Sequence, residues 1–216
     1  MSEQTRVNQT GSTSLRERKR EATRDALESA ALRLTVERGI DGATVDEICA
    51  AAGFSHRTFF NYFRSKEAAV LAGLTVSFDV PEAETFLAGG PTGDVYADLK
   101  WLVIDLVRAS AERGEEWRDR LLLLVEHPDL MVARRDHQLE LTRGLVEVIR
   151  LRLPGEDRAE VLAGIVMIAL ATAVRRWSEA GDDASFDRML LESFDVVDDV
   201  ARTVMVGGGA VPEPLA

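Results

Sequence analysis

The stretch that decides the fold is ATVDEICAAAGFSHRTFFNYFRSKE, residues 43–67. It predicts two short helices on either side of Gly53, a residue type that interrupts helices. The first helix begins with the Thr-Val-Asp-Glu of residues 44–47, a capping box in which the Thr and Glu side chains satisfy backbone amides. Ser55 can cap the second helix, from His56 to about Phe63. Two short helices joined by a tight turn that contains glycine are typical of a helix-turn-helix.

Polar side chains open the second helix, in the part that enters the major groove of DNA in such motifs. Arg57 can make a bidentate contact with O6 and N7 of guanine, and His56 can donate or accept at a base edge. Hydroxyl and cationic groups around them suit phosphate contacts. We therefore expect double-stranded DNA as a partner, contacted by Thr44, Ser55, His56, Arg57, Thr58, Phe60, Asn61, Tyr62 and Lys66.

Three phenylalanines of the second helix have different expected environments. Phe59 and Phe63 are four residues apart on one helix face, so both are predicted to pack into the core. The position of Phe60 is left open between the core and a contact with the sugar backbone or a thymine methyl group.

These motifs resemble the N-terminal signature of the TetR family of bacterial regulators, through residues 43–48, 51–55, 58–63 and 65–67. The resemblance covers about residues 15–75. It implies a homodimer with two DNA-reading heads and an all-helical C-terminal domain that binds a small molecule. It also implies phosphate contacts at the positions of Thr44, Ser55, Thr58, Tyr62 and Lys66. The family often has Tyr at the position of Phe60. The missing hydroxyl group removes one possible hydrogen bond to phosphate.

The net charge of −11 seems unsuited to DNA binding, but the charge is unevenly distributed. Residues 1–75 contain 11 Lys and Arg against 10 Asp and Glu, whereas residues 76–216 contain 15 against 27. A basic run, Arg16–Arg20, opens the N-terminal part, and it is interpreted either as a solvated face or as part of a phosphate-facing head. The distribution fits a head that faces DNA on an acidic body.

The composition is that of an ordinary globular protein, with 46% hydrophobic and 29% charged residues. No apolar run approaches the roughly 18 residues of a membrane span, and the polar N-terminus does not resemble a secretory signal. We expect a cytoplasmic protein without membrane contact. Cys49 is the only cysteine, which excludes an intramolecular disulfide and favours an inert buried thiol.

Helical apolar spacing predicts an all-α fold, a three- to four-helix head followed by a helical bundle. Residues 79–92 contain glycines and prolines and are interpreted as a loop or linker. The expected domains are a disordered tail at 1–14, the DNA-binding head at 15–75, an effector-binding and dimerisation domain at 76–206 and a flexible tail at 207–216. Helices are expected at 15–38, 94–113, 115–126, 129–152, 156–180 and 186–206.

The C-terminal bundle is expected to bind a small apolar or amphipathic effector. A pocket needs apolar walls with a few polar groups, although tryptophan and methionine at helical spacing are more often core residues. Helices 156–180 and 186–206 carry apolar residues on more than one face, which predicts a two-fold interface in a homodimer. The candidate pocket residues are Trp101, His127, Met131, Arg134, His137, Met167 and Arg175.

No catalytic constellation, metal site or cofactor is expected. His127 and His137 are ten residues apart, which is not ligand spacing on one helix face. The main hypothesis is a ligand-responsive repressor. A helical binder or enzyme with a vestigial head is the competing class, and an activator on the same scaffold is a third hypothesis.

Overall fold

The computed structural model describes residues 15–74, 76–78, 80–112, 114–127, 130–154, 156–181 and 184–205. Within these ranges every regular element is a helix and no strand is present, which confirms the predicted all-α class. No helix in these ranges is both long enough and apolar enough to span a membrane. The chain divides into two compact units, one ending at Val70 and the other beginning at Leu71. The tails predicted at 1–14 and 207–216 lie outside the described residues.

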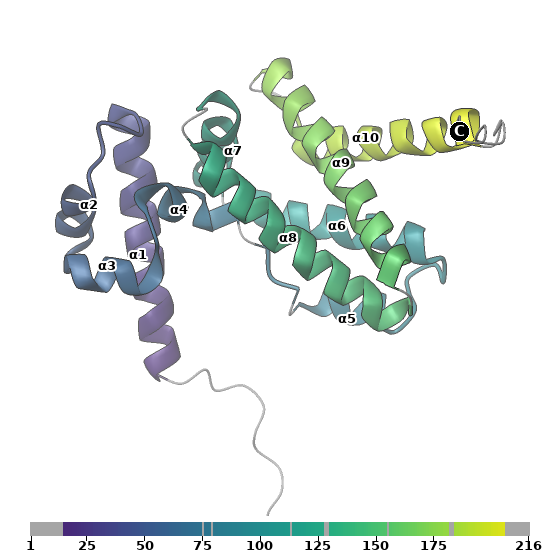
Figure 1. Cartoon of the computed structure of the whole chain (residues 1–216), viewed down its shortest axis with the longest axis horizontal. Coiled ribbons are helices and arrows are strands. Elements are labelled where there is room, and N and C mark those ends of the chain that lie inside the picture. Colours follow the sequence, from purple (N-terminus) through teal and green to yellow (C-terminus); the bar gives the residue numbers. More distant parts are fainter. Residues whose placement is uncertain are drawn as a thin grey trace, which may run out of the picture. The chain divides into compact units, whose positions relative to one another are not determined.

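The first unit is built on the long helix α1 (Leu15–Arg38), followed by α2 (Val45–Ala52), α3 (His56–Tyr62) and all but the last residue of α4 (Lys66–Leu71) (Figure 1). α1 ends where Gly39 takes a left-handed conformation, with φ of 74°, and donates its amide to the Thr35 carbonyl at 2.8 Å. The core of the unit comes from one face of α1 and from the short helices. Its members include Leu27, Ala31, Leu34, Ile48, Phe59 and Phe63.

The α2–α3 hairpin has the caps that its sequence predicts. The Thr44 side chain accepts the Glu47 amide, and the Glu47 carboxylate accepts the Thr44 amide, which completes the capping box. α2 ends at Gly53, whose φ of 75° lies in the left-handed region, and Phe54 donates its amide to the Cys49 carbonyl at 2.9 Å. Ser55 caps α3 by accepting the Thr58 amide at 3.1 Å. This local chemistry sets the helix-turn-helix.

The second unit begins with a 3₁₀ turn, η1 (Ala72–Leu74), and continues as a bundle of helices. Within it α9 packs against both α8 and α10 (Figure 1). A short π-helical turn, Ala201–Met205, follows the last helix. The helices of this unit are α5 (Pro81–Leu87), α6 (Val95–Ala111), α7 (Glu115–Glu126), α8 (Met131–Arg152), α9 (Glu156–Ala180) and α10 (Phe186–Val200).

Helix α5 corrects the prediction of a loop over residues 79–92. Pro81 occupies the first turn, where its missing amide hydrogen costs nothing, and Glu82 and Glu84 lie near the positive end of the helix dipole. Ala83 and Phe86 are buried on one face. The glycines that suggested a linker lie after this helix, in residues 89–93.

A buried ion pair joins α6 to the end of α8. Arg152 Nη2 lies 2.6 Å from Asp98 Oδ2, and the two side chains are 8% and 0% exposed. Arg152 also donates to the Phe86 carbonyl at 3.0 Å. Burial alone would raise the pKa of Asp98, but hydrogen bonds from Thr92 and Arg152 lower it to about 2. The pair therefore connects α5, α6 and α8 through a carboxylate that stays ionised.

Candidate nucleic-acid interface and effector cavity

Helix α3 presents one exposed face and one buried face. Phe59 is fully buried and Phe63 is 5% exposed, which confirms their predicted core positions. Phe60, left open by the sequence, is 49% exposed and its ring centroid lies 4.8 Å from that of His56. Arg57 and Asn61 are exposed as well. The four side chains at positions 56, 57, 60 and 61 share one side of the helix and can reach a groove together.

Three of the four hydroxyl groups proposed as phosphate contacts, those of Thr44, Ser55 and Thr58, already have partners within the head. Ser55 Oγ and Thr58 Oγ1 are 2.8 Å apart. One hydroxyl of such a pair donates to the other, so the second keeps its hydrogen for another acceptor. The Thr44 hydroxyl donates to Glu47 Oε2 at 2.8 Å. The Ser55–Thr58 pair therefore keeps one hydroxyl hydrogen that could be donated to a phosphate, whereas the Thr44 hydroxyl already donates its hydrogen to Glu47.

Lys66 has a structural contact that the sequence did not indicate. Its ammonium group donates to the Ile40 carbonyl at 2.5 Å and to the Ala43 carbonyl at 3.0 Å. These carbonyls belong to the turn between α1 and α2, so the side chain ties α4 to that turn. An ammonium group has three N–H donors, so these two bonds leave one N–H for a further acceptor.

An ion pair connects the start of α2 to the end of α1. Arg38 Nη1 lies 2.8 Å from Glu47 Oε1, while the other carboxylate oxygen serves the capping box. Hydrogen bonds from the Thr44 side chain and backbone, together with the charge of Arg38, lower the pKa of Glu47. The helix-turn-helix is therefore held to α1 by a charged contact as well as by its core.

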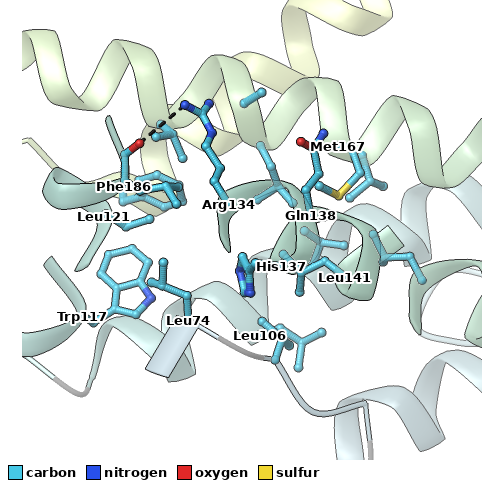
Figure 2. A pocket seen from close by; sticks show the side chains of 18 of the residues that line it. Leu74, Leu106, Trp117, Leu121, Arg134, His137, Gln138, Leu141, Met167 and Phe186 are labelled. Carbon is cyan, nitrogen blue, oxygen red and sulfur yellow. Dashed lines mark hydrogen bonds between the residues drawn. The ribbon is translucent and has the colours of Figure 1, made fainter. Parts of the chain in front are cut away.

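A cavity of about 210 Å³ lies within the second unit. Sixteen of its 19 lining residues are apolar, and the other three, Arg134, His137 and Gln138, come from one side of α8. Figure 2 shows the His137 ring among Leu74, Leu106 and Leu141. Trp117 of α7 and Leu74 of η1 form other parts of the wall. The arrangement suits an apolar molecule with a single polar group.

The polar wall of the cavity carries one permanent charge, that of Arg134. Burial lowers the pKa of His137, against a smaller opposite effect of Glu140, so the imidazole is neutral near pH 7. Arg134 is the cation of the wall, and its Nη1 lies 3.5 Å from the Leu124 carbonyl (Figure 2). Gln138 adds an amide that can donate or accept. These groups can hold a carboxylate or a carbonyl oxygen.

The predicted effector residues fall into three groups. Arg134, His137 and Met167 line the cavity. Trp101, His127 and Arg175 do not line it: His127 caps the end of α7, and Arg175 pairs with Glu179 at 3.2 Å. The side chain of Met131 lies outside the described residues. Spacing within one helix could not identify the wall, because η1, α6, α7, α8, α9 and α10 all contribute to it.

Two family models account for most of the described chain. Residues 27–72 match the model of bacterial regulatory proteins of the tetR family, and residues 94–202 match the MftR C-terminal domain. The chain belongs to the TetR family. No curated protein has a significantly similar sequence.

Solved structures of TetR-family proteins share this fold. A TetR-family transcriptional regulator from Mesorhizobium loti MAFF303099 is 17% identical, with a TM-score of 0.54 over 84% of this chain and 96% of the other. FadR of Thermus thermophilus, a TetR-family transcriptional repressor in complex with lauroyl-CoA, is 20% identical, with a TM-score of 0.53 over 89% and 100%. The helix-turn-helix unit and the helical second unit are thus those of a TetR-family regulator.

Proposed function

We propose that this TetR-family protein is a sequence-specific, DNA-binding repressor that works as a homodimer and responds to a small apolar or amphipathic effector. The observation that carries the proposal is the exposed face of α3. His56, Arg57 and Asn61 stand free of the core while Phe59 anchors the opposite face. Such a helix can present side chains to base edges without disturbing its own packing. We place its action in the cytoplasm, where its DNA would be found.

The effector we propose combines an apolar chain with one carboxylate or carbonyl group. The apolar lining accounts for the chain, and Arg134, His137 and Gln138 account for the polar group. The lauroyl-CoA bound to the Thermus thermophilus protein supports an effector with an acyl chain. Binding must favour one state of the protein over the other, because equal affinity for both would shift nothing.

The homodimer is proposed to form through α9 and α10. Val161 and Ile168 lie two turns apart on one face of α9, and each is 62% exposed. On α10, Val196 and Val200 are 52% and 48% exposed. Apolar side chains left open on two adjoining helices suit a self-complementary interface with a second copy.

DNase footprinting on the DNA that flanks the native gene tests the proposed function. A protected segment with two half-sites about one helical turn apart, lost on addition of lauric acid or lauroyl-CoA, is the expected result. Arg33→Ala, an exposed change on the outer side of α1, is the matched control and should keep the footprint. Absence of any protected segment on that DNA would contradict the proposal.

A further inference from the structure

The effector cavity has two ends that differ in exposure and in polarity. Its polar lining residues Arg134 and Gln138 are exposed near the start of α8, and Ala171 of α9, which also lines the cavity, is exposed. Farther along the two helices, the lining residues Leu145 and Val166 are 3% and 0% exposed. The cavity is therefore nearest to solvent beside its polar groups and ends among buried apolar side chains.

An ion pair between α8 and α9 shows where the buried end lies. Arg150 Nη2 and Glu160 Oε1 are 3.3 Å apart, where the end of α8 adjoins the start of α9. Leu145 and Val166 lie five and six residues from this pair along their helices, whereas Arg134 lies 16 residues from it. The buried end is therefore close to the junction of the two helices, and the polar groups are at the opposite end of α8.

Helix α6 contributes to the same end of the cavity. Val103 lines the cavity and is 4% exposed. It follows Asp98 by five residues, and Asp98 forms the buried ion pair with Arg152 at the end of α8. Side chains of three helices therefore meet at this end. We define the apolar floor of the cavity as Val103, Leu145 and Val166.

The apolar floor rests on a filled core. One helical turn beyond it, Leu99 of α6 and Ile149 of α8 are fully buried and do not line the cavity. Along α8, Arg134 and Leu145 are 11 residues apart, which is about 16 Å at 1.5 Å per residue. Because protein interiors are close-packed, a chain that reaches the floor can be lengthened only by displacing core side chains.

The α7 side of the cavity lies beside the polar groups rather than at the far end. Arg134 Nη1 is 3.5 Å from the carbonyl of Leu124, which is in the last turn of α7, and Leu121 is one turn earlier. Both leucines line the cavity. A ligand whose polar group is held at Arg134 therefore begins beside α7, and the long direction of the cavity leads from there to the apolar floor.

We propose that the apolar floor selects effectors by chain length: a straight acyl chain, held by its carboxylate or carbonyl group at Arg134, runs along α8 and ends against the floor. The proposal rests on the proposed effector class and adds which residues discriminate among its members. Each buried methylene group favours binding by about fourfold, so affinity rises with chain length until the floor is reached. Longer chains then lose affinity, because they overpack the core.

Calorimetric titration of the full-length protein with straight-chain acids from octanoate to octadecanoate, as free acids and as CoA thioesters, tests the proposal. Leu145→Ala and Leu121→Ala form a matched pair, because each shortens a buried leucine that lines the cavity. Leu145→Ala should raise the affinity for the next longer even-numbered chain, relative to the wild-type optimum, by roughly tenfold. Leu121→Ala should keep the wild-type order of preference.

Val166→Phe adds volume to the apolar floor and should move the preference to shorter chains, so the test does not depend on a variant that leaves a void. An unchanged preference in either floor variant that remains folded, or an equal shift in Leu121→Ala, would overturn the inference while the proposed effector class stands. A wild-type affinity that keeps rising through octadecanoate would do the same. If no chain binds in either series, the effector class fails together with the inference.

Discussion

Arg57 is the residue on which base reading depends most directly. It is exposed in the first turn of α3, and its guanidinium can donate two parallel hydrogen bonds to guanine. Arg57→Ala should weaken operator binding by about 1–3 kcal/mol and relax the preference at one base position. Fluorescence anisotropy with a set of singly substituted operators measures both effects. An unchanged preference at every position would remove Arg57 from this role.

Lys66 is predicted to serve the fold of the head as well as DNA. Lys66→Met leaves the Ile40 and Ala43 carbonyls without this donor, and a loss of about 1–3 kcal/mol in local stability is expected. Hydrogen exchange should accelerate in residues 40–52. All three tryptophans lie in the second unit, so thermal unfolding followed by tryptophan fluorescence should stay as in the wild type and serves as the control. Unchanged exchange would show that the contact contributes nothing.

Side-chain roles at this scale could be predicted only in part. The caps at Thr44 and Ser55 and the core positions of Phe59 and Phe63 follow from residue type and spacing, which are local properties. The bond of Lys66 to the α1–α2 turn could not be predicted, because its carbonyl partners lie more than 20 residues away.

At the level of the helices, the junction of α5, α6 and α8 should lose stability in acid. The folded-state pKa of Asp98 is lowered to about 2 from an ordinary value of 3.8. Its contribution to stability is therefore complete above pH 3.8 and is lost as the pH falls toward 2. Urea unfolding at several pH values, followed by tryptophan fluorescence, should show the wild type converging on Asp98→Asn in this window. A constant gap between the two proteins would contradict the assignment.

The same junction supplies a stability test near neutral pH. Arg152→Leu removes the cation of a buried pair, a change that typically costs about 3–5 kcal/mol of unfolding free energy. Urea unfolding of the second unit measures it, with the exposed Arg150→Leu as control, since Arg150 is 39% exposed in its pair with Glu160. Equal losses for the two variants would show that burial of the pair is unimportant.

The contact between α8 and the segment after η1 shapes the cavity. A Cβ on Gly144 would lie 2.7 Å from Cε2 of Phe78, which itself lines the cavity. Gly144→Ala should therefore displace the Phe78 ring and change affinity for lauric acid, although alanine usually stabilises a helix by about 0.5–1 kcal/mol. Calorimetric titration measures it. Adding Phe78→Leu should restore part of the affinity, and simple additivity of the two changes would argue against the contact.

Helices were predicted better than the surfaces they form. Periodicity indicates each long helix because every turn repeats the same burial pattern. It failed at α5, where a helix of seven residues lies between a proline and a glycine-rich loop and offers too short a pattern. It also failed to separate Arg134 and His137 from His127 and Arg175, because the cavity wall is assembled from several helices.

For the whole molecule, the proposed dimer can be tested by placing a charged side chain in its proposed interface. Ile168→Glu would bury a carboxylate between two copies and should shift the protein to the mass of a monomer. Light scattering coupled to size-exclusion chromatography measures the mass at micromolar concentration. Val132→Glu is the control, because Val132 is 73% exposed on α8, outside the proposed interface. A dimer that persists with Ile168→Glu would remove α9 from the interface.

The uneven charge of the chain is consistent with separate roles for its two parts. A nearly neutral first part and an acidic remainder can bind DNA at one end while the acidic part avoids it. The distribution was visible in the sequence.

The proposed function depends above all on recognition of a specific DNA sequence by α3. Its most direct test is the affinity of the full-length protein for a selected operator and for a scrambled duplex of equal length, both at 150 mM KCl. We expect the operator to be bound at least about 10³-fold more tightly and Arg57→Ala to narrow this ratio. Equal affinity of the wild type for the two duplexes would contradict it.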